Sequence, residues 1–169
     1  MRRAIAHAKN GDWPASKAVD KVTLDYDGRH RRRYRLRTNG GENVLLDLTE
    51  AVAMADGDGL RLDDNHWLSV QAGLEKLIEI TAGNFEHLAR VAWHLGNRHL
   101  PAAISADRIL IRPDHVIESM VLGLDASVRP VTEPFQPEYG AYHEHRHSPP
   151  SSTSCPKARI FHTHQRGSF

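Results

Sequence analysis

The chain has 169 residues, a formal net charge of +1, 25% charged and 40% hydrophobic residues, a composition typical of an ordinary globular protein of one or two domains. It has no apolar run near the roughly 18 residues that a membrane-spanning helix needs, and its start, MRRAIAHAKNGDW, lacks the apolar core of a signal peptide. We therefore expect a cytoplasmic protein with no membrane partner, and the single cysteine, Cys155, excludes an intrachain disulfide.

Short segments with a period of two fill the first half of the chain. KVTLDY alternates apolar and polar residues, and Asp27-Gly28 is a hairpin signal before the next expected strand, RHRRRYRLRT. Turn residues at 39–41, 56–59 and 63–65 then separate the expected strands NVLLDL, LRL and HWLSVQ. Because no helical segment lies between these strands, the pattern predicts an all-β domain over residues 1–72.

The second half mixes strands with helical periodicity. LEKLIEI at 74–80 predicts a strand, and the helix that follows has Asn84 as its N-cap and Gly96 as its end. PAAIS and RILIR predict two short strands, Asp114 caps a second helix with the sequence HVIESMVLGL, and SVRPVTEPF predicts a last strand. The order βαββαβ predicts a ferredoxin-like domain over residues 73–141, so the expected fold class is α+β.

Residues 142–169 form a segment with no hydrophobic periodicity. It is rich in serine, proline, histidine and basic residues, and has too few apolar side chains to offset the entropy of ordering a backbone, about 1–2 kcal/mol per residue. We expect a disordered tail.

Histidine is the unusual feature of the composition, with 12 residues in 169. In the tail, histidines occur at alternate positions, which in an extended segment places their side chains on one side about 7 Å apart at Cα. Such a tract predicts binding of a transition metal by neutral imidazole. The alternatives are histidines without consequence and a purification tag, although the interrupted pattern argues against a tag. The histidines concerned are His143, His145, His147, His162 and His164.

The stretch WHLGNRHLP holds two further histidines at the end of the first predicted helix. His94 lies within the helix, and His99 follows it in the loop that leads to Pro101. A spacing of five is not the i, i+4 spacing at which two histidines of one helix chelate a single ion. The helix dipole also favours a protonated histidine just after a helix C-terminus, which gives His99 a purely structural alternative.

These residues resemble the UreE family of urease accessory metallochaperones. The resemblance is carried by WHLGNRHLP, PDHVIESMVLGLD and PFQPEYGAYHEHRH, together with LDYDGRHRRRYRLRTNGGENVLLDL and DGDGLRLDD, from about residue 17 to 147. Its most specific piece is Gly-Asn-Arg-His followed two residues later by proline.

The resemblance implies a homodimer that carries Ni²⁺ to apo-urease together with the accessory proteins UreG, UreF and UreD or UreH, and that catalyses no reaction itself. It also implies an N-terminal β domain of the peptide-binding type and a ferredoxin-like metal-binding domain. His99 would supply one ligand from each subunit across the twofold axis, and the tail histidines would complete or supplement the site. Zn²⁺ or Cu²⁺ would fit the same imidazole ligands.

Two features depart from the family pattern. Some relatives have a second histidine two residues before His115, where this chain has Pro113, so His115 is a ligand or simply an exposed residue in the first turn of its helix. The tail also lacks the long polyhistidine runs of some relatives, which puts metal storage, but not delivery, in doubt.

The run of arginines admits a different function. On an extended strand Arg31, Arg33, Arg35 and Arg37 would share one face, away from Tyr34. Such a row contacts phosphates, pairs with acidic neighbours such as Asp25 and Asp47, or binds a partner protein. We favour the partner surface and expect no nucleic acid.

Two other functions remain as rivals. One is a general divalent metal buffer or zinc-handling protein, and the other is a hydrolytic metalloenzyme, for which HEHRH is not the helical His-Glu-x-x-His motif.

Overall fold

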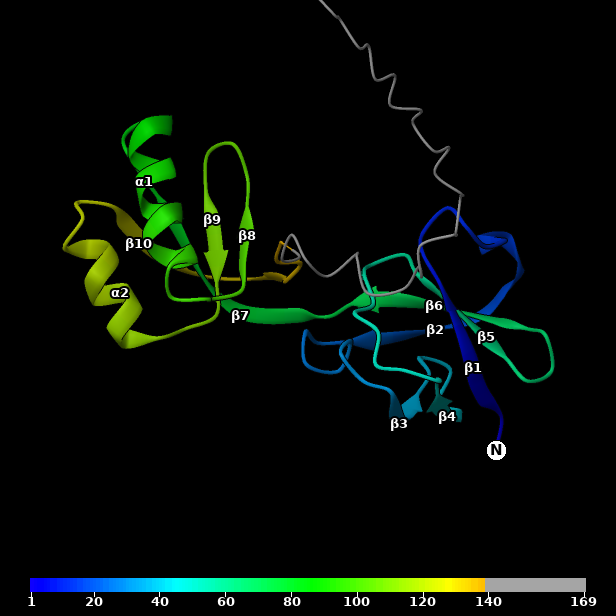
Figure 1. Cartoon of the computed structure of the whole chain (residues 1–169). Helices are drawn as coiled ribbons and strands as arrows, with labels where there is room; N and C mark the ends of the chain where they lie inside the picture. Colours follow the sequence, from blue (N-terminus) through cyan, green and yellow to red (C-terminus); the bar gives the residue numbers. More distant parts are fainter. Residues whose placement is uncertain (139–169) are drawn as a thin grey trace, which may run out of the picture. The chain divides into compact units, whose positions relative to one another are not determined.

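Two β-sheets and two α-helices make up the part of the chain that the computed structural model describes, residues 1–138 (Figure 1). The predicted α+β class is therefore confirmed. The expected tail, residues 142–169, and its five histidines lie outside the described residues, as do the last residues of the second expected domain. No helix within residues 1–138 has the length and apolar character needed to cross a membrane.

The first sheet has six strands and no α-helix among them. They lie in the order β2-β6-β5-β1-β4-β3, and a short 3-10 helix, η1 (Ala15–Lys17), precedes β2. This agrees with the prediction of an all-β first part. The strands are β1 (Arg3–Ala8), β2 (Ala18–Leu24), β3 (Arg33–Arg37), β4 (Asn43–Asp47), β5 (Gly59–Leu62) and β6 (Trp67–Ala72).

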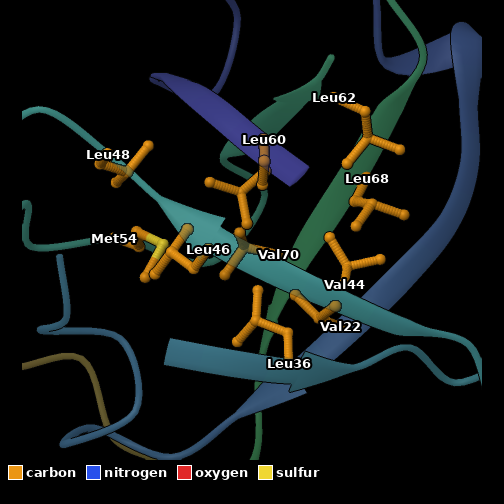
Figure 2. Packing of buried hydrophobic residues seen from close by; sticks show 11 residues of the cluster. Val22, Leu36, Val44, Leu46, Leu48, Met54, Leu60, Leu62, Leu68 and Val70 are labelled. Atoms are coloured by element: carbon orange, nitrogen blue, oxygen red, sulfur yellow. The ribbon is translucent and has the colours of Figure 1, made fainter. Parts of the chain in front are cut away.

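The core of the first sheet is aliphatic (Figure 2). Alternate residues of each strand supply it, as the period of two requires: Val44 and Leu46 from β4, Leu60 and Leu62 from β5, and Leu36 from β3 are all fully or almost fully buried. Burial of one such side chain contributes about 1.5–3 kcal/mol, so this cluster is the main stabilising term of the sheet.

The predicted hairpin at Asp27-Gly28 is wrong. β2 pairs with β6 in parallel, whereas β3 pairs only with β4. After β2 the chain turns because the Asp25 carboxylate accepts a hydrogen bond of 2.7 Å from the Gly28 N–H. Arg29, expected in a strand, is buried in this turn and donates to the backbone carbonyls of Met54 and Phe135.

Strand β3 consequently starts at Arg33, so Arg31 lies outside the arginine row in which it was expected. Strand β1 was not predicted at all, yet it lies inside the sheet, parallel to β4 and antiparallel to β5. Its sequence, RAIAHA, is rich in alanine, which has a low preference for strands, and burial between two neighbours overrides that preference.

The second sheet is antiparallel, with the strand order β10-β7-β9-β8, and both helices pack on one of its faces (Figure 1). Leu88, Val91 and Leu95 of α1 and Ile117 and Val121 of α2 are the buried helical residues of this core. The predicted order of strands and helices is thus present. The elements are β7 (Leu74–Thr81), α1 (Phe85–Gly96), β8 (Ala102–Ile104), β9 (Ile109–Ile111), α2 (His115–Leu122) and β10 (Ser127–Pro134).

Gly59 makes room for the ring of Trp13. A Cβ atom at Gly59 would overlap the Trp13 indole, which is buried and stacks on Trp67 with ring centroids 5.3 Å apart. We expect Gly59→Ala to lower the free energy of unfolding by about 1–3 kcal/mol, since overpacking forces the ring to move. Urea denaturation and the near-ultraviolet circular dichroism of the indoles measure this. Gly83→Ala is the control, because nothing lies within 4 Å of its added methyl group, and an equal loss in both variants would contradict the explanation.

Ion pairs occupy the face of the second sheet that the helices do not cover. The Glu79 carboxylate accepts hydrogen bonds from Arg108 at 2.8 Å and from Arg129 at 2.7 Å, and Arg108 also binds Glu133 at 2.8 and 2.9 Å. The hydrogen bonds from Arg108 and Arg129 lower the pKa of Glu79.

A lowered pKa in the folded state stabilises the fold at pH values above the unfolded-state pKa of about 4.3, and this contribution is lost as the pH falls through the folded-state value. We therefore expect Glu79→Gln to be less stable than wild type at pH 7, with a difference that shrinks towards pH 3. Urea denaturation at both pH values checks this. Glu86→Gln, at an exposed i, i+4 pair with Arg90, should change little at either pH, and a Glu79→Gln deficit that is constant with pH would refute the mechanism.

Candidate metal site at the end of helix α1

Helix α1 fixes the position of His99. The helix starts at its N-cap, where the Asn84 side chain accepts a hydrogen bond of 2.9 Å from the His87 N–H, and it ends at Gly96 as predicted. The chain then folds back on the last turn: the N–H of Arg98 donates to the Leu95 carbonyl at 3.0 Å and that of His99 to the Gly96 carbonyl at 2.9 Å. These bonds hold the loop that carries His99 against the helix end.

His99 has a left-handed backbone, with φ of 55°. Glycine is the usual residue in this conformation after a helix, whereas a residue with a Cβ atom costs roughly 1–2 kcal/mol there. Gly96 is the last helical residue, whereas the left-handed position is His99, three residues later. A costly backbone at a histidine is the kind of local strain that concentrates at functional sites.

The ring nitrogens of the described histidines fall into two groups. Four rings have hydrogen-bond partners: His7 with Asp58 at 2.6 Å, His30 with the Tyr26 carbonyl at 2.8 Å, His66 with Asp64 at 3.2 Å and His87 with the Leu124 carbonyl at 2.6 Å. The rings of His94, His99 and His115 have no such partner within residues 1–138. Their lone pairs are therefore available without first breaking a hydrogen bond.

Chain neighbours of His99 and His115 line one pocket. Both histidines are exposed, and their neighbours Leu100 and Asp114 help to line a cavity of about 380 Å³ between the loop after α1 and the start of α2. The Asp114 side chain accepts from the N–H groups of Val116 at 2.9 Å and Ile117 at 3.2 Å, which fixes the first turn of α2 as predicted. His94 is half-buried instead, with its ring edge-on to Trp93.

These residues do not complete a metal site within one chain. Among residues 1–138 no three side chains of histidine, cysteine, aspartate or glutamate lie close enough together to hold an ion. One exposed imidazole binds a transition metal only weakly, so a site at His99 needs ligands from outside the described part of this chain. His143, His145, His147, His162 and His164 are such candidates by sequence, and they lie outside the described residues.

Family models match almost the whole chain. Residues 2–73 match the UreE urease accessory protein N-terminal domain, and residues 75–167 match its C-terminal domain. The chain belongs to the UreE urease accessory protein family. This confirms the resemblance seen in the sequence, and the family is one of accessory proteins rather than enzymes.

Relatives from several bacteria are about 50% identical to this chain over the matched region. Urease accessory protein UreE of Rhizobium rhizogenes strain K84 is 49% identical over 145 residues, which are 86% of this chain and 86% of the relative. The proteins of the same name from Agrobacterium fabrum strain C58 and Bradyrhizobium sp. strain ORS 278 are both 52% identical over 78% of this chain. The matched region covers 82% of the first of these two and 62% of the second.

Proposed function

We propose that this chain is a metallochaperone that binds Ni²⁺ and delivers it to apo-urease during urease maturation. The observation that carries the proposal is His99: an exposed imidazole with no hydrogen bond within residues 1–138, held on a left-handed backbone, in a member of a urease accessory family. Imidazole is a good ligand for nickel. The partners expected with this role are UreG, UreF and UreD or UreH, in the cytoplasm.

A homodimer supplies the second ligand. An isologous interface places equivalent residues of two chains together, so two His99 side chains can meet at the twofold axis. The surface of α1 supports such an interface, because Phe85, Ala89 and Trp93 recur every four residues, are exposed, and form an apolar stripe that runs towards His99. Phe85 and Trp93 are 74% and 65% exposed, which is unusual for large apolar side chains without a partner.

Ligand exchange would move the ion. Two imidazoles on a surface, supplemented by His115 and by the tail histidines, hold Ni²⁺ without enclosing it. Protons compete with the metal for neutral imidazole, whose ordinary pKa is about 6.5, so binding should weaken below about pH 6. A partner that presents more or better ligands then takes the ion.

We further propose a fold type for the second sheet and a boundary between the two domains. We assign the second sheet and its helices to the ferredoxin-like arrangement, supported by the strand order and by antiparallel pairing throughout. We place the domain boundary at residues 72–73, supported by Gly73 between β6 and β7 and by the change of family model at residues 73–75. Residues 142–169 would be a separate His-containing tail.

Counting nickel ions tests the proposal. In a variant whose five tail histidines are replaced by glutamine, we expect calorimetric titration to give half an equivalent of Ni²⁺ per chain, with the ion shared by two His99 side chains. Light scattering should give twice the 19.0 kDa of one chain. A monomer that binds a full equivalent with undiminished affinity would rule out the shared site.

A general metal buffer or zinc-handling protein is the alternative, favoured by the rings of His94, His99 and His115, which have no hydrogen-bond partner among the described residues. Affinity alone does not separate the two functions, since Cu²⁺ outcompetes Ni²⁺ at most imidazole sites. Activation of apo-urease does. The nickel-loaded chain should raise urease activity in the presence of the other accessory proteins beyond the level given by the same concentration of free Ni²⁺, whereas a buffer would lower it.

A further inference from the structure

Four arginines lie on the outer face of the first sheet, one on β1 and three on β3, with β4 between these two strands. Residues directly opposite each other in a sheet share a face, and the register places Arg3 of β1 beside Leu45 of β4, and Leu45 beside Arg35 of β3. The other arginines of β3, Arg33 and Arg37, lie two residues on either side of Arg35 and therefore on the same face. We call Arg3, Arg33, Arg35 and Arg37 the arginine face.

This face has a large excess of positive charge. Its one carboxylate within residues 1–138 is Asp47, opposite Arg33, which lies 3.8 Å from both Arg3 and Arg33. Arg35 and Arg37 are exposed and have no ion-pair partner in the same described part of the chain. The side chains of Arg3 and Arg33 remain 53% and 63% exposed in spite of Asp47. Self-repulsion among these guanidinium groups favours an anionic partner.

We infer that the arginine face is a docking surface for an acidic segment of a partner protein. Guanidinium forks bind carboxylates in a bidentate manner, and arginines on alternate strand residues are spaced about 7 Å apart, the spacing of alternate side chains in another extended chain. Leu45, partly buried at the centre of the face, adds an apolar contact. Arginine around an apolar centre is typical of protein interfaces.

Two other occupants fit less well. Nucleic acid would need aromatic rings for stacking beside these arginines, but Tyr34, which is half exposed, pairs with Leu46 and so lies on the opposite face of the strand. A second copy of the chain, docked face to face, would place arginine against arginine. The face belongs to the first sheet, not to the elements that carry His99 and His115, so it extends the proposed function to a separate partner contact.

Binding of a labelled peptide tests the inference. The probe is a nine-residue peptide of alternating glutamate and threonine, measured by fluorescence anisotropy against metal-free protein, with nine-residue oligothymidylate and a Gly-Ser peptide beside it. We expect the acidic peptide to bind best and to lose about tenfold in affinity in Arg35→Gln/Arg37→Gln, a loss of roughly 0.7 kcal/mol per arginine.

The matched control is Lys76→Gln/Arg90→Gln, which removes the same charge from exposed residues outside this face. It should bind the peptide like wild type. An equal loss in both double variants, tighter binding of oligothymidylate, or no binding of the acidic peptide to wild type would each overturn the inference.

Discussion

His99→Gly is expected to remove nickel from the subunit interface while the fold stays intact. In the variant without tail histidines, the substitution deletes both imidazoles of the proposed shared site at once. We expect the affinity for Ni²⁺ to fall by more than about 100-fold. Mutating a residue that only hydrogen-bonds to a ligand typically costs about 10- to 100-fold. Calorimetric titration measures the affinity.

The free energy of unfolding of His99→Gly should stay the same or rise. Glycine adopts the left-handed backbone of residue 99 without the cost of about 1 kcal/mol that a Cβ atom imposes, although its greater freedom in the unfolded chain offsets part of this gain. His99→Val, which strains the same backbone and also lacks an imidazole, should lose both stability and nickel. His94→Gln is the matched control and should keep the ion. Nickel affinity in His99→Gly equal to that of its parent would contradict the assignment of the ligand.

The largest loss of stability is expected from Asp58→Ala. The Asp58 carboxylate is 2% exposed and joins three separate segments: it contacts the His7 ring at 2.6 Å and accepts from the N–H groups of Ala55 at 2.8 Å and Asn10 at 2.9 Å. Alanine would leave these partly buried groups without the carboxylate that they now contact. We expect the free energy of unfolding to fall by about 3–5 kcal/mol, measured by urea denaturation.

Asp58→Asn keeps the shape and one acceptor oxygen, so its loss should be smaller, about 1–3 kcal/mol, and it keeps the test informative if the alanine variant does not fold. Burial opposes ionisation of Asp58, but the hydrogen bonds from His7, Ala55 and Asn10 outweigh it and lower its pKa. The stabilisation is therefore present above the unfolded pKa of about 3.9 and is lost as the pH falls further. Asp107→Asn, on an exposed loop, is the control, and a loss below about 1 kcal/mol for Asp58→Ala would show that the buried carboxylate is not required.

The sequence predicted the second sheet and its helices better than the first sheet. Helix α1 and its caps follow from local signals, the Asn84 side chain at one end and the break in periodicity after Gly96 at the other. The pairing of β2 with β6 joins residues about fifty positions apart, so it could not be predicted from the local turn signal at Asp27-Gly28. Parallel pairing of β1 with β4 is equally non-local, so an alanine-rich strand went unrecognised.

The candidate site was predicted in part. The Gly-Asn-Arg-His motif singled out His99 as a ligand. Nothing in the order of residues predicted that the left-handed backbone would fall at His99 rather than at Asn97 or Arg98. Asp58 was interpreted only as a turn residue in DGDG, because its three partners come together only in the folded chain. The arginine row was recognised, whereas Arg3, which joins it from β1, was not.

The three tryptophans of this chain have different surroundings. Trp13 is buried against Trp67, while Trp93 is 65% exposed on α1, with its ring centroid 5.0 Å from that of His94. Iodide in solution should therefore quench the emission of Trp93 first, and a second chain covering this helix should shift that emission to shorter wavelength and shield it from the quencher. Assembly at the proposed nickel site thus has an intrinsic optical reporter that needs no attached dye.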